Sequence, residues 1–127
     1  MTYKNVLLID DDEDDQEIFL DAVMEVSTSI TCNAISNAVE ALNKLVSKIL
    51  EPEVIFLDLN MPIMDGEQFL KEIKLHPELR EIPVIIYSTT SVEQIILKMK
   101  SMGAHDFITK PNSFFELKSI LKSSLTK

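Results

Sequence analysis

Short apolar runs alternate along this chain with longer stretches of helical periodicity, and four of the runs end before a residue with an ionisable or hydroxyl side chain. These four runs are rich in β-branched or aromatic side chains: residues 6–9 before Asp10 and Asp11, 54–57 before Asp58, 84–87 before Ser88, and 107–109 before Lys110. Runs of this length, separated by helical patterns, predict buried parallel strands. A fifth strand is predicted near residues 30–34, where Ile30, Cys32 and Ala34 alternate with polar residues.

Amphipathic helices are predicted between the strands. Apolar residues recur at helical spacing in five segments, at 18–26, 39–49, 69–73, 92–102 and 117–125. Ser91 with Gln94, and likewise Ser113 with Glu116, have the spacing of a capping box at a helix start. Gly103 follows the fourth helical segment, as a C-terminal cap does. The methionines at positions 99 and 102 lie on an apolar stripe and are predicted to be core residues.

Strand–helix units joined by right-handed crossovers predict an α/β fold, a doubly wound five-stranded parallel sheet with helices on both faces. In such a sheet the carboxyl ends of the strands lie along one edge, where these folds bind ligands. The residues that follow the strands are therefore expected to meet: Asp10, Asp11, Asp58, Ser88 and Lys110. The sequence predicts one site that combines carboxylates, a hydroxyl and an ammonium group.

Carboxylates crowded at one edge repel one another and need a cation. Lys110 supplies one positive charge, and Mg²⁺ is the divalent ion that fits best, because it is a hard cation that takes oxygen ligands. Zinc has no ligand set, since His105 is the only histidine or cysteine near these strand ends.

The acidic run at residues 10–15 is bounded by a predicted strand and a predicted helix, so it does not read as a disordered tail. Its later members, Glu13 to Asp15, are expected on the first helical turn, where the helix dipole favours negative charge, and no catalytic role is assigned to them. A calcium loop is rejected, because Asp15 stands where an EF-hand requires glycine and Asp21 replaces the terminal glutamate.

Mg²⁺, a lysine and a small hydroxyl around one carboxylate favour phosphoryl transfer, in which catalysis is mostly positioning and electrostatics. Asp58 is the natural nucleophile, since a carboxylate can form an acyl phosphate. No separate general base is needed, because an aspartate is ordinarily ionised at neutral pH.

Composition restricts the class of protein. The chain has 127 residues, enough for one domain, and its 12 basic and 21 acidic side chains give a net charge of −9, which argues against a nucleic-acid surface. No apolar stretch is long enough to span a bilayer and no signal peptide is evident, so neither a membrane nor export is expected. The single Cys32 excludes an internal disulfide and suits the cytoplasm.

Four motifs, LLIDDDEDD, IFLDLNMPIMDG, PVIIYSTT and FITKP, follow one another at specific spacing over nearly the whole chain. With them the chain resembles the receiver domain of two-component response regulators, and in length the single-domain, CheY-like members. The resemblance implies a flavodoxin-like (βα)5 fold with strand order 2-1-3-4-5, and a single receiver domain over residues 1–127 without an output domain.

The resemblance also assigns roles to residues at the site. It implies that Asp58 is the phosphoacceptor, that Asp11 binds Mg²⁺ directly, and that Asp10 acts mainly through water. The metal is also held by the Asp58 carboxylate and by the backbone carbonyl of Asn60, and Mn²⁺ can replace Mg²⁺. Ser88 matches the position of the switch hydroxyl.

Four further assignments come from the resemblance. Lys110 matches the lysine that grips the phosphoryl group, and its bond to Pro111 is expected to be cis. Phe107 stands where many relatives have a tyrosine that turns inward on activation, although it lacks the hydroxyl. Asn60 and Thr90 occupy positions that tune the rate of dephosphorylation.

The implied function is a phosphorylation switch. A histidine kinase or a phosphotransfer protein donates a phosphoryl group to Asp58, Ser88 moves toward it, and Phe107 fills the space that Ser88 leaves. The face formed by the fourth helix, the strand of Phe107 and the fifth helix then changes shape and binds a downstream protein. The only reactions expected are Mg²⁺-dependent phosphorylation and dephosphorylation of Asp58 itself.

Two other functions compete with this interpretation. A hydrolase of the haloacid dehalogenase type uses a second aspartate two positions after the nucleophile, where this chain has Asn60. A pseudo-receiver would dock to proteins without taking phosphate, but such modules usually lack site residues that this chain retains. Whether the chain is a stand-alone protein or an excised receiver stays open, although its start and its uninterrupted finish favour a complete protein.

Overall fold

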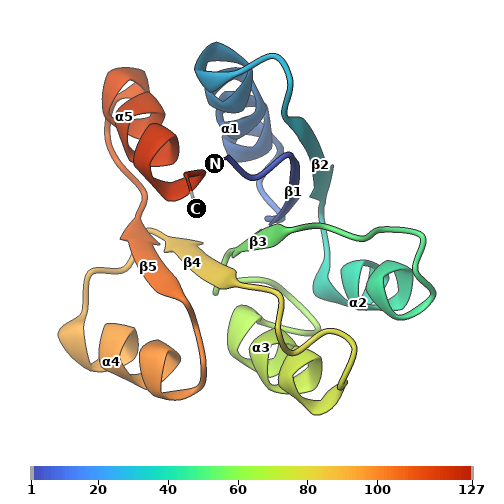
Figure 1. Ribbon diagram of the computed structural model, residues 1–127. Coiled ribbons are helices and arrows are strands. Elements are labelled where there is room, and N and C mark those ends of the chain that lie inside the picture. Colours follow the sequence, from blue (N-terminus) through green and yellow to red (C-terminus); the bar gives the residue numbers. More distant parts are fainter. Residues whose placement is uncertain (1, 127) are drawn as a thin grey trace.

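The computed structural model describes residues 2–126 and consists of one parallel sheet covered by helices on both faces (Figure 1). The strands are β1 (Asn5–Ile9), β2 (Thr31–Ile35), β3 (Val54–Leu57), β4 (Val84–Ser88) and β5 (Asp106–Thr109). The helices are α1 (Glu13–Val26), α2 (Ala38–Val46), α3 (Gly66–Leu75), α4 (Glu93–Ser101) and α5 (Phe114–Ser124). The strand order is β2-β1-β3-β4-β5 and all pairings are parallel, which confirms the predicted flavodoxin-like α/β fold.

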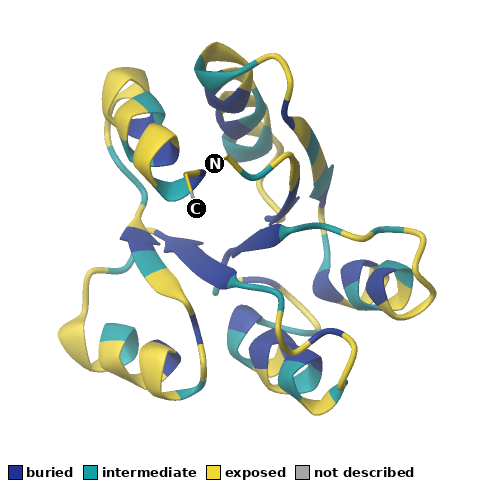
Figure 2. Ribbon diagram, in the orientation of Figure 1, coloured by how far each residue is buried: buried dark blue, intermediate teal, exposed yellow. Residues whose placement is uncertain are grey.

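The sheet separates two apolar cores, because successive side chains on a strand point to opposite faces. Leu7 and Ile9 pack on the side of α2, α3 and α4, whereas Val6 and Leu8 pack on the side of α1 and α5. On the α1 side, the Phe19 ring meets two aromatic rings edge-on, with centroid distances of 5.0 Å to Phe56 and 5.3 Å to Tyr87. Figure 2 shows the central strands buried and the outer helix faces exposed.

Helix ends agree with the predicted caps in part. Ser113 caps α5, its hydroxyl oxygen accepting a hydrogen bond of 3.1 Å from the amide of Glu116. Gly103 follows α4 with φ +102°, a conformation that favours glycine. The predicted box at Ser91 is wrong, because α4 begins one residue later and Val92 caps it without a side-chain bond.

Other differences concern the capping box at α3, the end of α2 and one peptide bond. The capping box of the chain is at α3, between Asp65 and Gln68. Helix α2 ends at Val46, so Ile49 lies beyond it and is exposed. The expected cis bond before Pro111 is also wrong, because residues 2–126 contain only trans peptide bonds. Trans is the lower-energy isomer before proline by about 0.5–1 kcal/mol.

Two predictions about sulfur-containing residues hold. Met99 is buried and Met102 packs against the same core. Cys32 is half-buried against the core on the α1 side, and burial raises the pKa of its thiol to about 12. Within the described residues, no helix has the length and apolar character needed to cross a membrane.

Candidate functional site: an acidic pocket at the carboxyl edge of the sheet

Asp10 and Asp58 are neighbours because the strands before them are neighbours. Ile9 at the end of β1 is in register with Leu57 at the end of β3, and the amide of Asp58 donates to the carbonyl oxygen of Ile9 at 2.9 Å. One carboxylate oxygen from each of Asp10, Asp11 and Asp58 lies within 4.8 Å of the other two. The structure therefore brings together the three carboxylates that the sequence analysis placed at this edge.

The Asp10 carboxylate is wholly buried and held from two sides. Its Oδ1 accepts a hydrogen bond of 3.0 Å from the amide of Asp12, and its Oδ2 accepts one of 2.8 Å from Nζ of Lys110. Burial raises the pKa of Asp10, and the bond to Lys110 opposes that rise. The group is thus fixed in orientation, while its charge is only partly compensated.

Asp58 lies in the same pocket with 6 % of its surface exposed. Burial raises its pKa to about 6, and the negative charge of Asp10 adds to the rise. The positive charge of Lys110 and a hydrogen bond from the amide of Asn60 act in the opposite direction. A further cation beside these carboxylates would stabilise the ionised form of Asp58.

The donor set fits a hard divalent ion. Asp11 is exposed and the other two carboxylates are buried, so a bound ion would meet protein oxygens on one side and solvent on the other. Mg²⁺ prefers this arrangement, since it commonly uses one or two carboxylates and keeps several waters. An acidic triad of this kind is typical of a Mg²⁺ site.

Lys110 follows β5 and reaches the pocket from the side of α1. Its amide donates to the carbonyl oxygen of Ser88 at 2.7 Å, which ties the end of β5 to the end of β4. Its ammonium group is 2.8 Å from Oδ2 of Asp10 and 2.7 Å from Oδ2 of Asp15, and it lies 5.3 Å from the centroid of the Tyr87 ring. Burial alone would lower the pKa of Lys110, but the bonds to both aspartates raise it above its ordinary value.

Asp15 is a site contact that the sequence analysis missed. Asp15 was predicted on the first turn of a helix without a further role, and α1 does begin at Glu13. A signal was present, because Asp15 precedes Phe19 by four positions and Ala22 by seven, and both of these residues are buried. An aspartate on the apolar stripe of a helix faces the core, so its carboxylate needs a cation or a hydrogen-bond donor nearby.

Ser88 is the last residue of β4, and Thr90 lies in the link between β4 and α4. Ser88 is wholly buried, and its hydroxyl oxygen accepts a long hydrogen bond of 3.4 Å from the amide of Thr90. The Thr109 hydroxyl donates to the carbonyl oxygen of Thr90 at 3.0 Å, so this link is tied to β5 as well.

Phe107 and Asn60 come from β5 and from the loop that follows β3. Phe107 on β5 is half-buried and packs against the core beneath α3 and α4. Asn60 lies in the loop between β3 and α3 and is exposed. In the same loop Ile63 has φ +68°, a left-handed conformation unusual for a β-branched residue, and is 92 % exposed.

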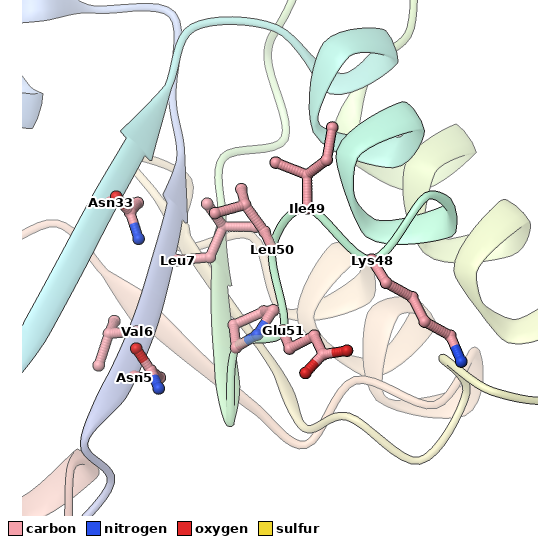
Figure 3. Close-up of a pocket in the computed structure, with 9 residues that line it drawn as sticks. Asn5, Val6, Leu7, Asn33, Lys48, Ile49, Leu50 and Glu51 are labelled. Atoms are coloured by element: carbon pink, nitrogen blue, oxygen red, sulfur yellow. The ribbon is translucent and has the colours of Figure 1, made fainter.

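A groove of about 380 Å³ lies elsewhere, at the amino edge of the sheet (Figure 3). It is lined by the start of β1, by Asn33 and by the loop of residues 48–52 that follows α2. None of the pocket carboxylates reaches it, so the groove is separate from the acidic pocket.

Comparison with known proteins gives a consistent picture. The family model described as "Response regulator receiver domain" matches residues 6–122. The two-component response regulator ORR8 of Oryza sativa subsp. indica is 32% identical over 122 residues, covering 96% of this chain and 98% of that protein. A protein-glutamate methylesterase/protein-glutamine glutaminase of Clostridium acetobutylicum is 42% identical over 94 residues, but this stretch is only 26% of its length.

Solved structures agree with these sequence relatives. The phosphorylated cyanobacterial phytochrome response regulator RcpA superposes with a TM-score of 0.87 at 28% identity, covering 96% of this chain and 91% of that one. The Mn²⁺-bound form of response regulator Rcp1 gives a TM-score of 0.80 at 25% identity, with coverage of 97% and 96%. The chain therefore belongs to the response regulator receiver domain family of two-component signalling, with Asp10, Asp11 and Asp58 as its acidic pocket for phosphorylation.

Proposed function

We propose that the chain accepts a phosphoryl group on Asp58 from a histidine kinase or a phosphotransfer protein, and that this changes a surface that binds a downstream protein. The observation that carries the proposal is the position of Asp58, buried at the end of β3 within reach of two other carboxylates and close to the charge of Lys110. The site is built to hold negative charge and a cation together.

The chemistry follows from these residues. A carboxylate oxygen of Asp58 attacks the phosphorus atom, the bond from phosphorus to the donor breaks, and the donor leaves with the electron pair of that bond. Because the pKa of Asp58 is about 6, most of its carboxylate is ionised at neutral pH and needs no base. Asp10, Asp11, Asp58 and the backbone carbonyl of Asn60 would hold Mg²⁺, or Mn²⁺ in its place, and the ion would supply positive charge beside the phosphoryl oxygens.

Ser88 and Lys110 bind the phosphoryl oxygens in this proposal. Ser88 is suited to the task because its present bond to Thr90 is long and easily exchanged. In the same proposal the side chains of Thr90 and Asn60 influence the access of water to the acceptor and so the rate of dephosphorylation. Phosphorylation and dephosphorylation of Asp58 are the only reactions assigned to the chain.

The switching surface is the face formed by α4, β5 and α5. Helix α4 lacks a side-chain cap, and Met99 is its only wholly buried residue, so it is held less firmly than its neighbours. Phe107 packs against the same core and is half-buried, so inward rotation would bury apolar surface that is now exposed. Moving such an equilibrium from 1:99 to 99:1 needs about 5.5 kcal/mol, which a few charge-assisted bonds to one phosphate can supply.

We propose further that residues 1–127 act as one receiver domain, and that this domain signals by docking to a partner protein. We place this phosphoryl transfer and docking in the cytoplasm, whose reducing conditions suit the free thiol of Cys32.

The test is labelling with radioactive acetyl phosphate in the presence of Mg²⁺. The wild-type chain should take up an acid-labile label that hydroxylamine also removes, as expected of an acyl phosphate, and the Asp58→Asn variant should take up none. Asp21→Asn, an exposed aspartate on α1, is the matched control and should label as the wild type does. Undiminished labelling of Asp58→Asn would place the acceptor elsewhere, and an unlabelled wild-type chain would make the protein a docking module.

A further inference from the structure

The ammonium group of Lys110 is shared between two carboxylates that differ in their freedom to move. Asp10 is wholly buried, whereas the side chain of Asp15 is 34% exposed. Their Oδ2 atoms lie 2.8 Å and 2.7 Å from Nζ, so the two bonds are equally short. Asp10 follows β1 and Asp15 belongs to α1, so Lys110 connects the sheet edge to a helix.

An ammonium group has three N–H donors. Two of them are engaged by Asp10 and Asp15, and Nζ lies over the Tyr87 ring, which favours a cation at its face. Lys110 is thus ion-paired to these two aspartates and acts on Asp58 only through its charge. A phosphoryl group on Asp58 has to compete with them for Lys110.

We propose that Asp15 is a positioning residue that restrains Lys110 and is released when the phosphoryl group binds. This inference rests on the proposed phosphorylation of Asp58. A phosphoryl group carries up to about two negative charges, so it both attracts Lys110 and repels the Asp15 carboxylate. Asp15 therefore lowers the affinity of the pocket for a phosphoryl group.

The surroundings allow Asp15, rather than Asp10, to leave. Asp15, Tyr87 and Lys110 line an open hollow of about 190 Å³ between α1 and the loop that precedes α5. The Asp15 side chain can rotate into this hollow and be hydrated there. Asp10 has no comparable exit, because it is wholly buried and bonded to the amide of Asp12.

Beryllofluoride, a phosphoryl mimic, provides the test, with saturating Mg²⁺ and binding followed by calorimetry. Asp15→Asn should bind beryllofluoride about fivefold more tightly than the wild-type chain. This is the effect expected when a partly exposed ion pair no longer competes with the mimic for Lys110. Asp14→Asn is the matched control, since it removes the same charge from the same helical turn at an exposed position, and its affinity should stay within about twofold. Asp15→Glu retains the charge and should bind like the wild type.

A second measurement separates restraint of Lys110 from a general effect on α1. In a Lys110→Gln background the gain from Asp15→Asn should shrink to about twofold or less, the direct effect of removing one charge, because the residue that Asp15 restrains is gone. Equal or weaker binding by Asp15→Asn, or the same gain in both backgrounds, would overturn the inference. If the wild-type chain neither labels at Asp58 nor binds beryllofluoride, the proposed function fails together with this inference. If the wild-type chain labels normally and Asp15→Asn has no effect, only the inference about Asp15 is overturned.

Discussion

Gly66 lies against the backbone of Asp58 so closely that no larger residue fits. A Cβ atom at position 66 would be 2.4 Å from the carbonyl oxygen of Asp58 and 2.7 Å from Cα of Leu59. Both neighbours are main-chain atoms and cannot rotate away. The amide of Gly66 also donates to the carbonyl oxygen of Leu59 at 3.0 Å, so the first turn of α3 and the chain after β3 hold each other in place.

Gly66→Ala is therefore expected to lower the free energy of unfolding by about 2 kcal/mol, although alanine is the better helix former. Urea denaturation measures the change. Lys71→Ala, at an exposed position of the same helix, should stay within about 0.5 kcal/mol of the wild type. Equal stability of Gly66→Ala and the wild type would show that α3 can shift away from Asp58 without cost.

The raised pKa of Asp58 makes stability depend on pH in a defined direction. The folded chain binds a proton at Asp58 below about pH 6, whereas the ordinary value for the group is 3.8. Between these values the folded state holds more protons than the unfolded state, so this residue's contribution to the free energy of unfolding falls as pH rises, by at most about 3 kcal/mol.

Asp58→Asn removes the loss of stability that comes from ionising a buried carboxylate. In metal-free buffer with EDTA the variant should be more stable than the wild type at pH 7.5 by about 2 kcal/mol, and the difference should close by pH 4. Urea unfolding of both chains across this range measures it. A difference that does not vary with pH would mean that Asp58 is not desolvated in the folded chain.

Mg²⁺ is expected to stabilise the chain through the acidic pocket. At ten times its dissociation constant, an ion that binds only the folded state adds about 1.4 kcal/mol, which raises the Tm by about 5 °C for a domain of this size. Thermal unfolding with and without Mg²⁺ measures the rise. Asp11→Asn should abolish it and Asp21→Asn should preserve it; a full rise in Asp11→Asn would show that Asp11 is not a ligand.

Asp12 supports the pocket by capping α1. Its Oδ1 accepts a hydrogen bond of 3.0 Å from the amide of Asp15, and its own amide donates to Asp10. Asp12→Ala should lower the free energy of unfolding by about 1 kcal/mol, since it removes the cap. Asp12→Ser keeps a capping oxygen and should recover most of that loss, as urea denaturation can show. If serine is as destabilising as alanine, the cap contributes little here.

Much of the site follows from local patterns in the sequence. A strand of four or five apolar residues ends where the first polar residue appears, and parallel strands end at one edge, so Asp10, Asp58, Ser88 and Lys110 were predictable neighbours. The same reasoning located the five helices, because their apolar stripes have a helical period.

Helix ends were less predictable than helix positions. Ser91 and Asp65 both precede residues of the right type for a capping box, but only the α3 box forms. Where a helix starts depends on how the preceding loop leaves the sheet, and nearby residues do not determine that path.

Which groups gather at the carboxyl edge follows from the order of residues along the chain, because strand length and helical period are local properties. Two contacts could be seen only in the folded chain: Lys110 pairs with Asp15, 95 positions away, and Gly66 lies against the backbone of Asp58. These contacts depend on the position of each helix relative to the sheet to within about an ångström, and side-chain packing across the whole core sets that position.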